Sequence, residues 1–236
     1  MKIISISSAK GGVGKSTLAI NLALSMKGKI LVCDFDSQAS LTDYFLRDTP
    51  LDDFINKTSY HFLTGKESAE SCILKSDNDS IYIIPASLDL IKIGIEMASD
   101  PMGVIRARKR LQALKYDYII IDTPPGIGFS MRAGLYCSDI ILTPIQFDRW
   151  TVQGLSMLAE EVEAISEART APEIIAVPYM TTEKESIQLQ DALSESFNVS
   201  KSFIGRKLPI RTAVNKGIPV KDSIKESFQN LSKEIA

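Results

Sequence analysis

Two lysines flank a glycine-rich turn near the start of the chain, where residues 9–17 read AKGGVGKST. Glycines let the backbone curl so that several N–H groups point inward, and at the N-terminus of a helix such groups bind phosphate oxygens. In this pattern Lys15 contacts the β- and γ-phosphates, and the hydroxyl of Ser16 contacts Mg²⁺. The pattern therefore predicts a nucleotide site. The alternative is a glycine-rich turn that holds no ligand.

The residues around this turn have the periodicity of a strand followed by a helix. Residues 3–6 form an apolar run of strand length, and Leu18, Leu22 and Met26 recur on one helical face. A glycine turn between a buried strand and a helix is the context in which this pattern binds phosphate. The context favours the nucleotide site over the turn without a ligand.

Two further apolar runs of strand length end in carboxylates. Asp34 ends the run 30–33, with Asp36 two residues further along, and Asp122 follows the run 118–121. Ligands of parallel sheets bind at the carboxyl ends of the strands, so these side chains are expected near the glycine-rich turn. We expect Asp122 to hold Mg²⁺ through a water molecule. Its alternative role is that of a turn or helix-capping residue.

Apolar runs of strand length alternate with segments of helical spacing along most of the chain. The runs are residues 3–6, 30–33, 81–84, 118–121, 140–142 and 174–177, and helices are expected to begin near residues 15, 102, 130, 152, 186 and 220. Strands that alternate with helices form a mostly parallel, twisted sheet with helices on both faces. The sequence predicts a three-layer α/β fold in one domain over residues 1–236, with residues 41–80 as its least regular part.

Composition limits the class of protein. The formal net charge of -2 argues against a wholly basic nucleic-acid-binding protein. No apolar run approaches the ~20 residues of a membrane span, so we expect a cytoplasmic protein. The chain enters its first strand at residue 2, so we expect no helix-turn-helix domain before it. Cys33, Cys72 and Cys137 are far apart and form no CxxC pair, which favours buried, reduced thiols over a metal or iron–sulfur site.

Taken together, these motifs resemble the deviant Walker ATPases of the ParA/MinD family, most closely the short ParA-type partition ATPases. The resemblance is carried by the loop at 10–17, by DFDSQASLT at 34–42 and by DTPPG at 122–126, and it extends over nearly the whole chain. It implies a P-loop NTPase fold of the deviant Walker A (SIMIBI) type. Ser37 and Ala39 depart from the family, which often has proline and glycine at these positions.

The resemblance also implies a role for each motif position. Lys10 would reach across a dimer interface to the partner's phosphates, Lys15 would bind the phosphates of its own nucleotide, and Asp36 would orient the attacking water. The implied ATP contacts are Gly11, Gly12, Val13, Gly14, Lys15, Ser16, Thr17, Pro209 and Ile210, and the implied Mg²⁺ contacts are Ser16 and, through water, Asp122.

Partition ATPases of this kind bind DNA without sequence preference when they are dimeric. Residues 196–221 hold six lysines and arginines, residues 101–116 hold five, and neither stretch contains a carboxylate. Binding to DNA phosphates without sequence preference requires several such side chains but no motif that contacts base edges. The alternative for each stretch is a solvated face without a partner. The residues expected to contact DNA are Arg206, Lys207, Arg211 and Lys216.

MinD-type relatives bind membranes instead, through a basic amphipathic helix at the C-terminus. Here Ile224, Phe228, Leu231 and Ile235 fall on one helical face, but acidic and basic residues are balanced on the same helix. We therefore expect a terminal helix packed on the core and no membrane binding. A MinD-like membrane-associated positioning ATPase is the alternative function.

The resemblance implies a slow, Mg²⁺-dependent ATPase that is stimulated by a ParB-like centromere-binding partner. ATP would hold the homodimer together and hydrolysis would dissolve it. The dimer would bind nonspecific DNA of the nucleoid in the cytoplasm and would segregate or position a plasmid or chromosome.

Overall fold

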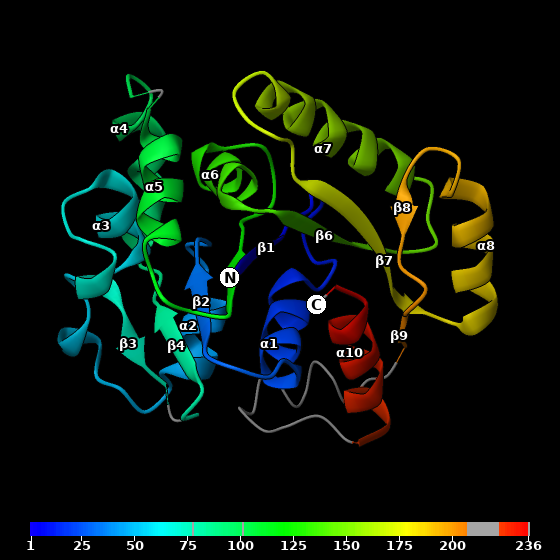
Figure 1. The fold of residues 1–236 in the computed structure, drawn as a ribbon, viewed down its shortest axis with the longest axis horizontal. Helices are drawn as coiled ribbons and strands as arrows, with labels where there is room; N and C mark the ends of the chain where they lie inside the picture. Colours follow the sequence, from blue (N-terminus) through cyan, green and yellow to red (C-terminus); the bar gives the residue numbers. More distant parts are fainter. Residues whose placement is uncertain (77, 101, 207–221, 236) are drawn as a thin grey trace.

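The computed structural model describes residues 1–76, 78–100, 102–206 and 222–235, and a nine-stranded sheet forms its centre (Figure 1). The strands are β1 (Lys2–Ile6), β2 (Ile30–Asp34), β3 (Leu74–Lys75), β4 (Ile81–Ile84), β5 (Tyr118–Asp122), β6 (Ile140–Ile145), β7 (Glu173–Thr181), β8 (Asn198–Val199) and β9 (Ile204–Gly205). Their order across the sheet is β3-β4-β2-β5-β1-β6-β7-β8, with β9 also paired to β7. All pairs are parallel except β3 with β4. The predicted mostly parallel sheet is confirmed, and each of the six apolar runs lies in a strand.

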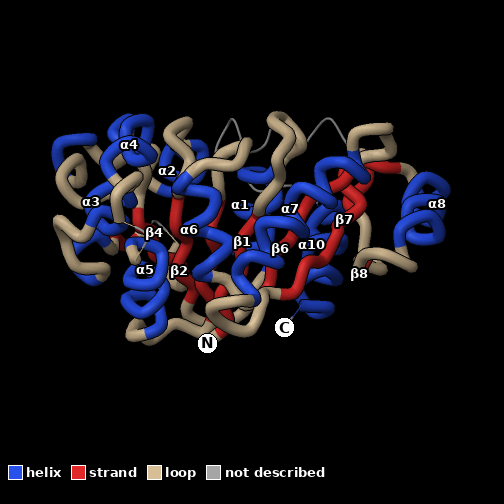
Figure 2. The backbone as a smooth tube through the Cα atoms, turned by 90° about the horizontal axis from the view of Figure 1, so that it is seen from above, coloured by secondary structure: helices blue, strands red, loops and turns tan. Residues whose placement is uncertain are grey.

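Helices cover both faces of this sheet, as the alternation of runs predicts (Figures 1 and 2). One face carries α1 (Lys15–Ser25), α2 (Ser40–Phe45) and α10 (Asp222–Ile235). The other carries α3 (Ser59–Thr64), α5 (Gly103–Gln112), α6 (Phe129–Cys137) and α7 (Thr151–Ser166), with α8 (Glu183–Leu193) packed near β7 and the short α4 (Ile93–Glu96) beside α6. Each predicted helix start lies within three residues of a helix in the described part of the chain.

Alternate residues of the central strands face opposite helical layers. Ile4 and Ile6 of β1 belong to the apolar core beneath α1 and α10, whereas Ile3 belongs to the core beneath α5 and α6. Successive side chains of a strand point to opposite faces, so a strand that is covered on both faces must be apolar at nearly every position. Strand β2 shows this requirement, because all five of its residues are buried.

Residues 41–80 are the least regular part of the described chain, as expected. This stretch holds most of α2, all of α3 and β3, and the 3-10 turns η1 (Leu51–Asp53) and η2 (Glu70–Cys72). These elements have only two to six residues, which is too short for a periodic pattern to reveal them. Residues 76–80 lie between β3 and β4, and residue 77 is outside the described residues.

The C-terminal helix α10 packs on the core. Ile224, Phe228, Leu231 and Ile235 are all buried and belong to the same apolar core as α1, which lies beside α10 in Figure 1. This confirms the expectation of a terminal helix packed on the core, and it leaves α10 without the free apolar face that a membrane-binding helix needs. No helix in the described ranges is both long and apolar enough to span a bilayer. Cys33, Cys72 and Cys137 are free and buried, as expected.

Phe228 offers a test of how much α10 contributes to stability. Its ring is fully buried, so Phe228→Ala should remove about 3–5 kcal/mol from the free energy of unfolding through lost burial and a residual cavity. The neighbouring Gln229 is exposed, and Gln229→Ala should change stability by no more than about 0.5 kcal/mol. Urea unfolding followed by circular dichroism measures both, and a similar small loss in the two variants would contradict the packing described here.

Candidate nucleotide-binding site

Three neighbouring strands end together and bring the predicted site residues to one edge of the sheet. Strands β2, β5 and β1 are adjacent and parallel, and Asp122 is in register with both Asp34 and Ile6. The glycine-rich loop follows β1, Asp36 follows β2, and residues 123–126 follow β5. The glycine-rich loop, the two segments that follow β2 and β5, and their carboxylates therefore converge at the carboxyl ends of the strands, where parallel sheets bind ligands.

The glycine-rich loop needs glycine at two positions for different reasons. Gly12 and Gly14 both have left-handed backbones, with φ of 74° and 96°. A Cβ at Gly12 would meet nothing within 4 Å, whereas a Cβ at Gly14 would lie 2.4 Å from Cε1 of Tyr179. Gly14 also caps the N-terminus of α1, and its carbonyl accepts a hydrogen bond of 2.9 Å from the N–H of Leu18. The loop is thus held against a strand that lies two positions away in the sheet.

Tyr179 is a supporting residue that motif reasoning does not find. It lies near the end of β7, its ring is almost fully buried, and burial raises its pKa while a hydrogen bond with Thr17 lowers it. The only sequence signal is an aromatic residue near the end of an apolar run. Its contact with Gly14 depends on the order of the strands in the sheet, which no local pattern contains.

Lys15 is a buried cation among carboxylates. Only 6% of the residue is exposed, and this burial lowers the pKa of Lys15, while the charges of Asp122 and Asp36 raise it. The two carboxylates therefore help to keep the ammonium protonated in a place where water does not solvate it. A charged lysine at the start of a helix, behind a curled glycine loop, is suited to contact phosphate oxygens.

Asp122 is fully buried, and neither of its oxygens forms a hydrogen bond of standard geometry within the described residues. Burial raises the pKa of Asp122 well above its ordinary value, and the charge of Asp34 adds to this, whereas Ser16 and Lys15 lower it. A buried carboxylate without a full set of donors fits a hydrated Mg²⁺, whose waters would supply them. Within the described ranges no group of three or more His, Cys, Asp or Glu side chains is arranged to hold a metal, so a cation here would also need phosphate oxygens.

Asp34 holds the loop after β2 in place. Its Oδ2 accepts hydrogen bonds from the backbone N–H and the hydroxyl of Thr42, at 2.9 and 2.8 Å, and the Thr42 hydroxyl accepts one of 2.8 Å from the N–H of Ala86. Burial raises the pKa of Asp34 to about 6, and the hydrogen bonds from Thr42 lower it. Asp34 therefore supports the site, while α2 begins next to Ala39, which adopts a left-handed conformation with φ of 55°.

Asp36 has one oxygen committed to its own loop. Its Oδ1 accepts a hydrogen bond of 2.9 Å from the N–H of Gln38, and its N–H donates to Oδ1 of Asp34 at 3.2 Å. The residue is buried, and its charge acts on both Lys15 and Asp122. This position next to the predicted phosphate site is compatible with a residue that orients water.

Lys10 differs from Lys15 in both exposure and partner. Its side chain is 44% exposed, and Nζ lies 2.6 Å from Oδ2 of Asp148, in the loop after β6. The two lysines of the glycine-rich loop are thus separated into a buried one and an outer one. Motif reasoning does not find Asp148, because its partner is 138 residues away in the sequence.

The structure describes one of the four predicted DNA-contacting residues. Arg206 is exposed, donates from Nε to the carbonyl of Met180 at 2.8 Å, and forms an ion pair of 2.9 Å with Glu185. Its charge is therefore partly balanced within the chain. The remaining predicted DNA contacts, Lys207, Arg211 and Lys216, and the predicted adenine neighbours, Pro209 and Ile210, lie outside the described residues.

The second basic stretch, residues 101–116, has largely internal roles. Arg106 forms an ion pair with Asp100, and Arg110 donates to the carbonyl of Phe62 at 2.8 Å. Arg108 is mostly buried, forms a 2.8 Å ion pair with Asp139 and donates to the carbonyl of Cys137. Three of the five basic side chains of this stretch thus have partners in the chain, which reduces the support that the stretch gives to the prediction of DNA binding.

Comparison with known proteins agrees with this geometry. A family model described as an AAA domain matches residues 1–175. The sporulation initiation inhibitor protein Soj of Bacillus subtilis is 29% identical, over 100% of this chain and 98% of Soj. The chromosome-partitioning ATPase Soj of Treponema pallidum is 28% identical, over 96% of this chain and 93% of the relative. A plasmid partition protein of Borrelia burgdorferi B31 bound to AMPPNP superposes with a TM-score of 0.83 at 28% identity, covering 99% of this chain and 97% of that protein.

Gly12 and Gly14 together provide a test of the loop's support. Both Gly→Ala variants place a side chain on a left-handed backbone, which costs ~1–2 kcal/mol, but only Gly14→Ala also collides with the ring of Tyr179, at an added cost of about 1–3 kcal/mol. Urea unfolding of both variants without nucleotide should show the larger loss for Gly14→Ala. Equal losses would mean that Tyr179 does not hold the loop.

Proposed function

Because the chain belongs to the ParA-type partition ATPases, we propose that it hydrolyses ATP slowly, as an ATP-bound homodimer on nonspecific DNA, and thereby segregates or positions a plasmid or chromosome. A ParB-like centromere-binding protein would stimulate hydrolysis, and the dimer would reside on the nucleoid in the cytoplasm. We further propose that residues 1–236 form one ATPase domain. The observation that carries this proposal is the pair of loop lysines, one buried beside Asp122 and one exposed on the surface.

We propose that ATP binds with its phosphates in the glycine-rich loop. The N–H groups of residues 11–17 and the ammonium of Lys15 would hold the phosphates, and Asp36 would orient the attacking water. Ser16 and, through water, Asp122 would hold Mg²⁺, which would neutralise charge on the phosphates. The buried carboxylate of Asp122, which lacks a hydrogen bond of standard geometry in the described part of the chain, supports this assignment.

The surface around Lys10 supports association with a second copy. Phe147, Trp150 and Val152 are all exposed, and they lie in sequence on both sides of Asp148, the ion-pair partner of Lys10. Exposed large apolar side chains gathered in one short segment are typical of a surface that a partner covers. In the proposed dimer Lys10 would leave Asp148 and contact the phosphates bound by the partner subunit.

We propose that the dimer binds DNA, and the packing of α10 disfavours membrane binding. The apolar face that a membrane-binding helix would use is buried against α1. The DNA assignment depends on the basic residues between 201 and 221, of which Arg206 is exposed at the end of the described segment.

Three variants test the proposed roles of Lys10 and Asp36. Asp36→Ala should bind ATP, hydrolyse it at least about 100-fold more slowly, and remain dimeric, because the water is no longer oriented. Lys10→Ala should bind ATP but remain monomeric. Asp148→Ala removes only the partner that Lys10 has in this structure, so it should dimerise at least as well as the unmodified chain.

Gel filtration with light scattering in ATP, together with single-turnover hydrolysis, measures these outcomes. Normal dimerisation of Lys10→Ala, or a monomeric Asp36→Ala in ATP, would contradict the proposed roles. If Lys10→Ala and Asp148→Ala both failed to dimerise, the ion pair itself would be what the dimer needs.

Arg206→Glu tests the DNA-binding surface. A charge reversal that is present twice in a dimer should weaken ATP-dependent binding to random DNA by about tenfold and reduce its salt dependence. Lys57 is exposed shortly before α3, which lies on the β3 side of the sheet, away from β9 and Arg206 (Figure 1), so Lys57→Glu makes the same charge change at a remote position and should leave DNA binding unchanged.

Cosedimentation with random DNA and with anionic liposomes, side by side across a salt series, measures the affinity for each and shows whether the chain binds DNA or membranes. Binding to liposomes alone would favour the MinD-like function. If Arg206→Glu left DNA binding intact, the DNA-binding surface would not include Arg206.

A further inference from the structure

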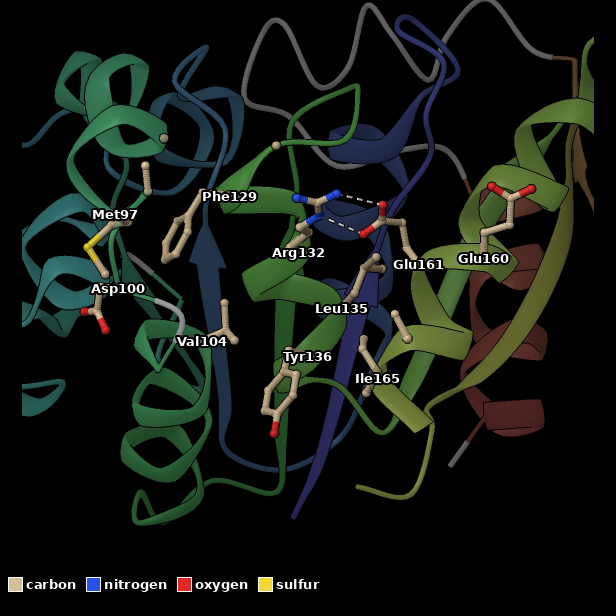
Figure 3. Close-up of a pocket in the computed structure, with 14 residues that line it drawn as sticks. Met97, Asp100, Val104, Phe129, Arg132, Leu135, Tyr136, Glu160, Glu161 and Ile165 are labelled. Carbon is tan, nitrogen blue, oxygen red and sulfur yellow. Dashed lines mark hydrogen bonds and ion pairs between the residues drawn. The ribbon is translucent and has the colours of Figure 1, made fainter. Parts of the chain in front are cut away.

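A groove with a volume of about 720 Å³ lies between α4, α6 and α7 (Figure 3). Its walls are mainly apolar, and the Arg132 side chain crosses it toward α7. The apolar residues that line it are Met97, Val104, Phe129, Leu135, Tyr136 and Ile165. The volume lies within the range of sites that bind a small ligand or several side chains of a partner.

The wall formed by α4 continues as an exposed apolar surface. Gly94 and Ala98 line the groove, and Ile91 and Ile95 fall on the same helical face at spacings of three and four residues. Ile91 is 72% exposed and Ile95 is 83% exposed. Two isoleucines left in water at the edge of an apolar groove indicate a surface that a partner covers.

The opposite wall, formed by α7, is acidic. Glu160 lines the groove and has no ion pair within the described residues, and Glu163 and Glu167 are exposed further along the same side of the helix. No lysine or arginine occurs between residues 150 and 168. Glu160, Glu163 and Glu167 are therefore exposed without a lysine or arginine of their own helix beside them.

The other charges at the groove do not reverse this sign. Glu161 accepts a bidentate ion pair from Arg132, with distances of 2.8 and 2.9 Å, and Asp100 is paired with Arg106. With these pairs balanced, Glu160 remains as the excess charge of the lining. An apolar channel with a negative rim selects a ligand that is apolar on one side and positively charged beside it.

We propose that this groove docks a basic amphipathic helix of another protein. The apolar side chains of the helix would enter between Phe129 and Ile95, and its lysines or arginines would face Glu160 and the carboxylates that follow it on α7. An amphipathic helix laid into an apolar groove is a common mode of peptide recognition, and charge complementarity sets its orientation.

The groove shares a chain segment with the nucleotide site. Gly128 and Phe129 line it, and they come directly after the loop that begins at Asp122. Pro125 in that loop lies near the phosphate loop, within 3.9 Å of where a Cβ on Gly11 would be. A helix in the groove would thus contact the same segment that contributes Asp122, although the docking itself requires no nucleotide.

A labelled model peptide tests the docking directly. The probe is an amphipathic Leu/Lys peptide of about 18 residues, or five helical turns, and its control is a Leu/Glu peptide with the same apolar pattern. Fluorescence anisotropy with the full chain, without nucleotide, should show binding of the Leu/Lys peptide, weakened by salt, and at least tenfold weaker binding of the Leu/Glu peptide.

Three variants locate the site on the chain. A Cβ at Gly94 meets nothing within 4 Å and Gly94 lies in a helix, so Gly94→Leu should fold and should reduce peptide affinity about tenfold by filling the groove. Glu160→Lys should reduce it at least threefold. Glu183 is exposed on α8, away from the groove, and Glu183→Lys makes the same charge change as a matched control that should bind as the unmodified chain does.

Equal binding of the two peptides, or unchanged affinity in both Gly94→Leu and Glu160→Lys, would overturn the proposal. Self-association without nucleotide that Gly94→Leu abolishes would also overturn it, because the occupant would then be a second copy of the chain. ATP binding by each variant is measured in parallel, so that a failure of the groove is distinguished from a failure of the proposed ATPase.

Discussion

The buried ammonium of Lys15 and the carboxylates of Asp122 and Asp36 form the interaction on which the nucleotide edge depends. Burial lowers the pKa of Lys15 and raises the pKa of Asp122, while the opposite charges act in the other direction. Charges are costly to bury unless each has a counter-charge or a hydrogen-bond partner. This edge of the sheet is thus arranged for a ligand that brings negative oxygens and a cation together.

Some side chains near these charges hold the loops of the site in place, whereas others are exposed and available for contact. Asp34 uses its oxygens to hold Thr42 and the loop after β2, and Tyr179 packs against Gly14 from β7. Lys10, by contrast, is exposed and paired with a residue that belongs to another surface loop. The proposed dimer requires this arrangement, in which the buried residues hold their positions and the outer lysine remains available to a second subunit.

Much of this architecture could be predicted because its signals are local. The long strands are apolar at nearly every position, since helices cover both of their faces, and the left-handed backbone at Gly12 and Gly14 explains why the loop contains those glycines. The short elements between residues 41 and 80 could not be predicted, because none is as long as the roughly 11–18 residues over which a helical period is recognised. The ion pairs of the basic stretch at 101–116 could not be predicted either, because the counter-charges Asp100 and Asp139 lie outside it in the sequence.

By itself, the sequence determined the strand–loop–helix unit, the carboxylates at the strand ends and the family. These depend on residue types within a few positions of one another. Only the tertiary structure decided that Tyr179 supports Gly14, that Asp148 pairs with Lys10, and that α4 and α7 enclose a groove with an acidic rim. Each of these contacts joins segments that are distant in the chain, and their juxtaposition follows from strand order and helix packing, which local spacing does not encode.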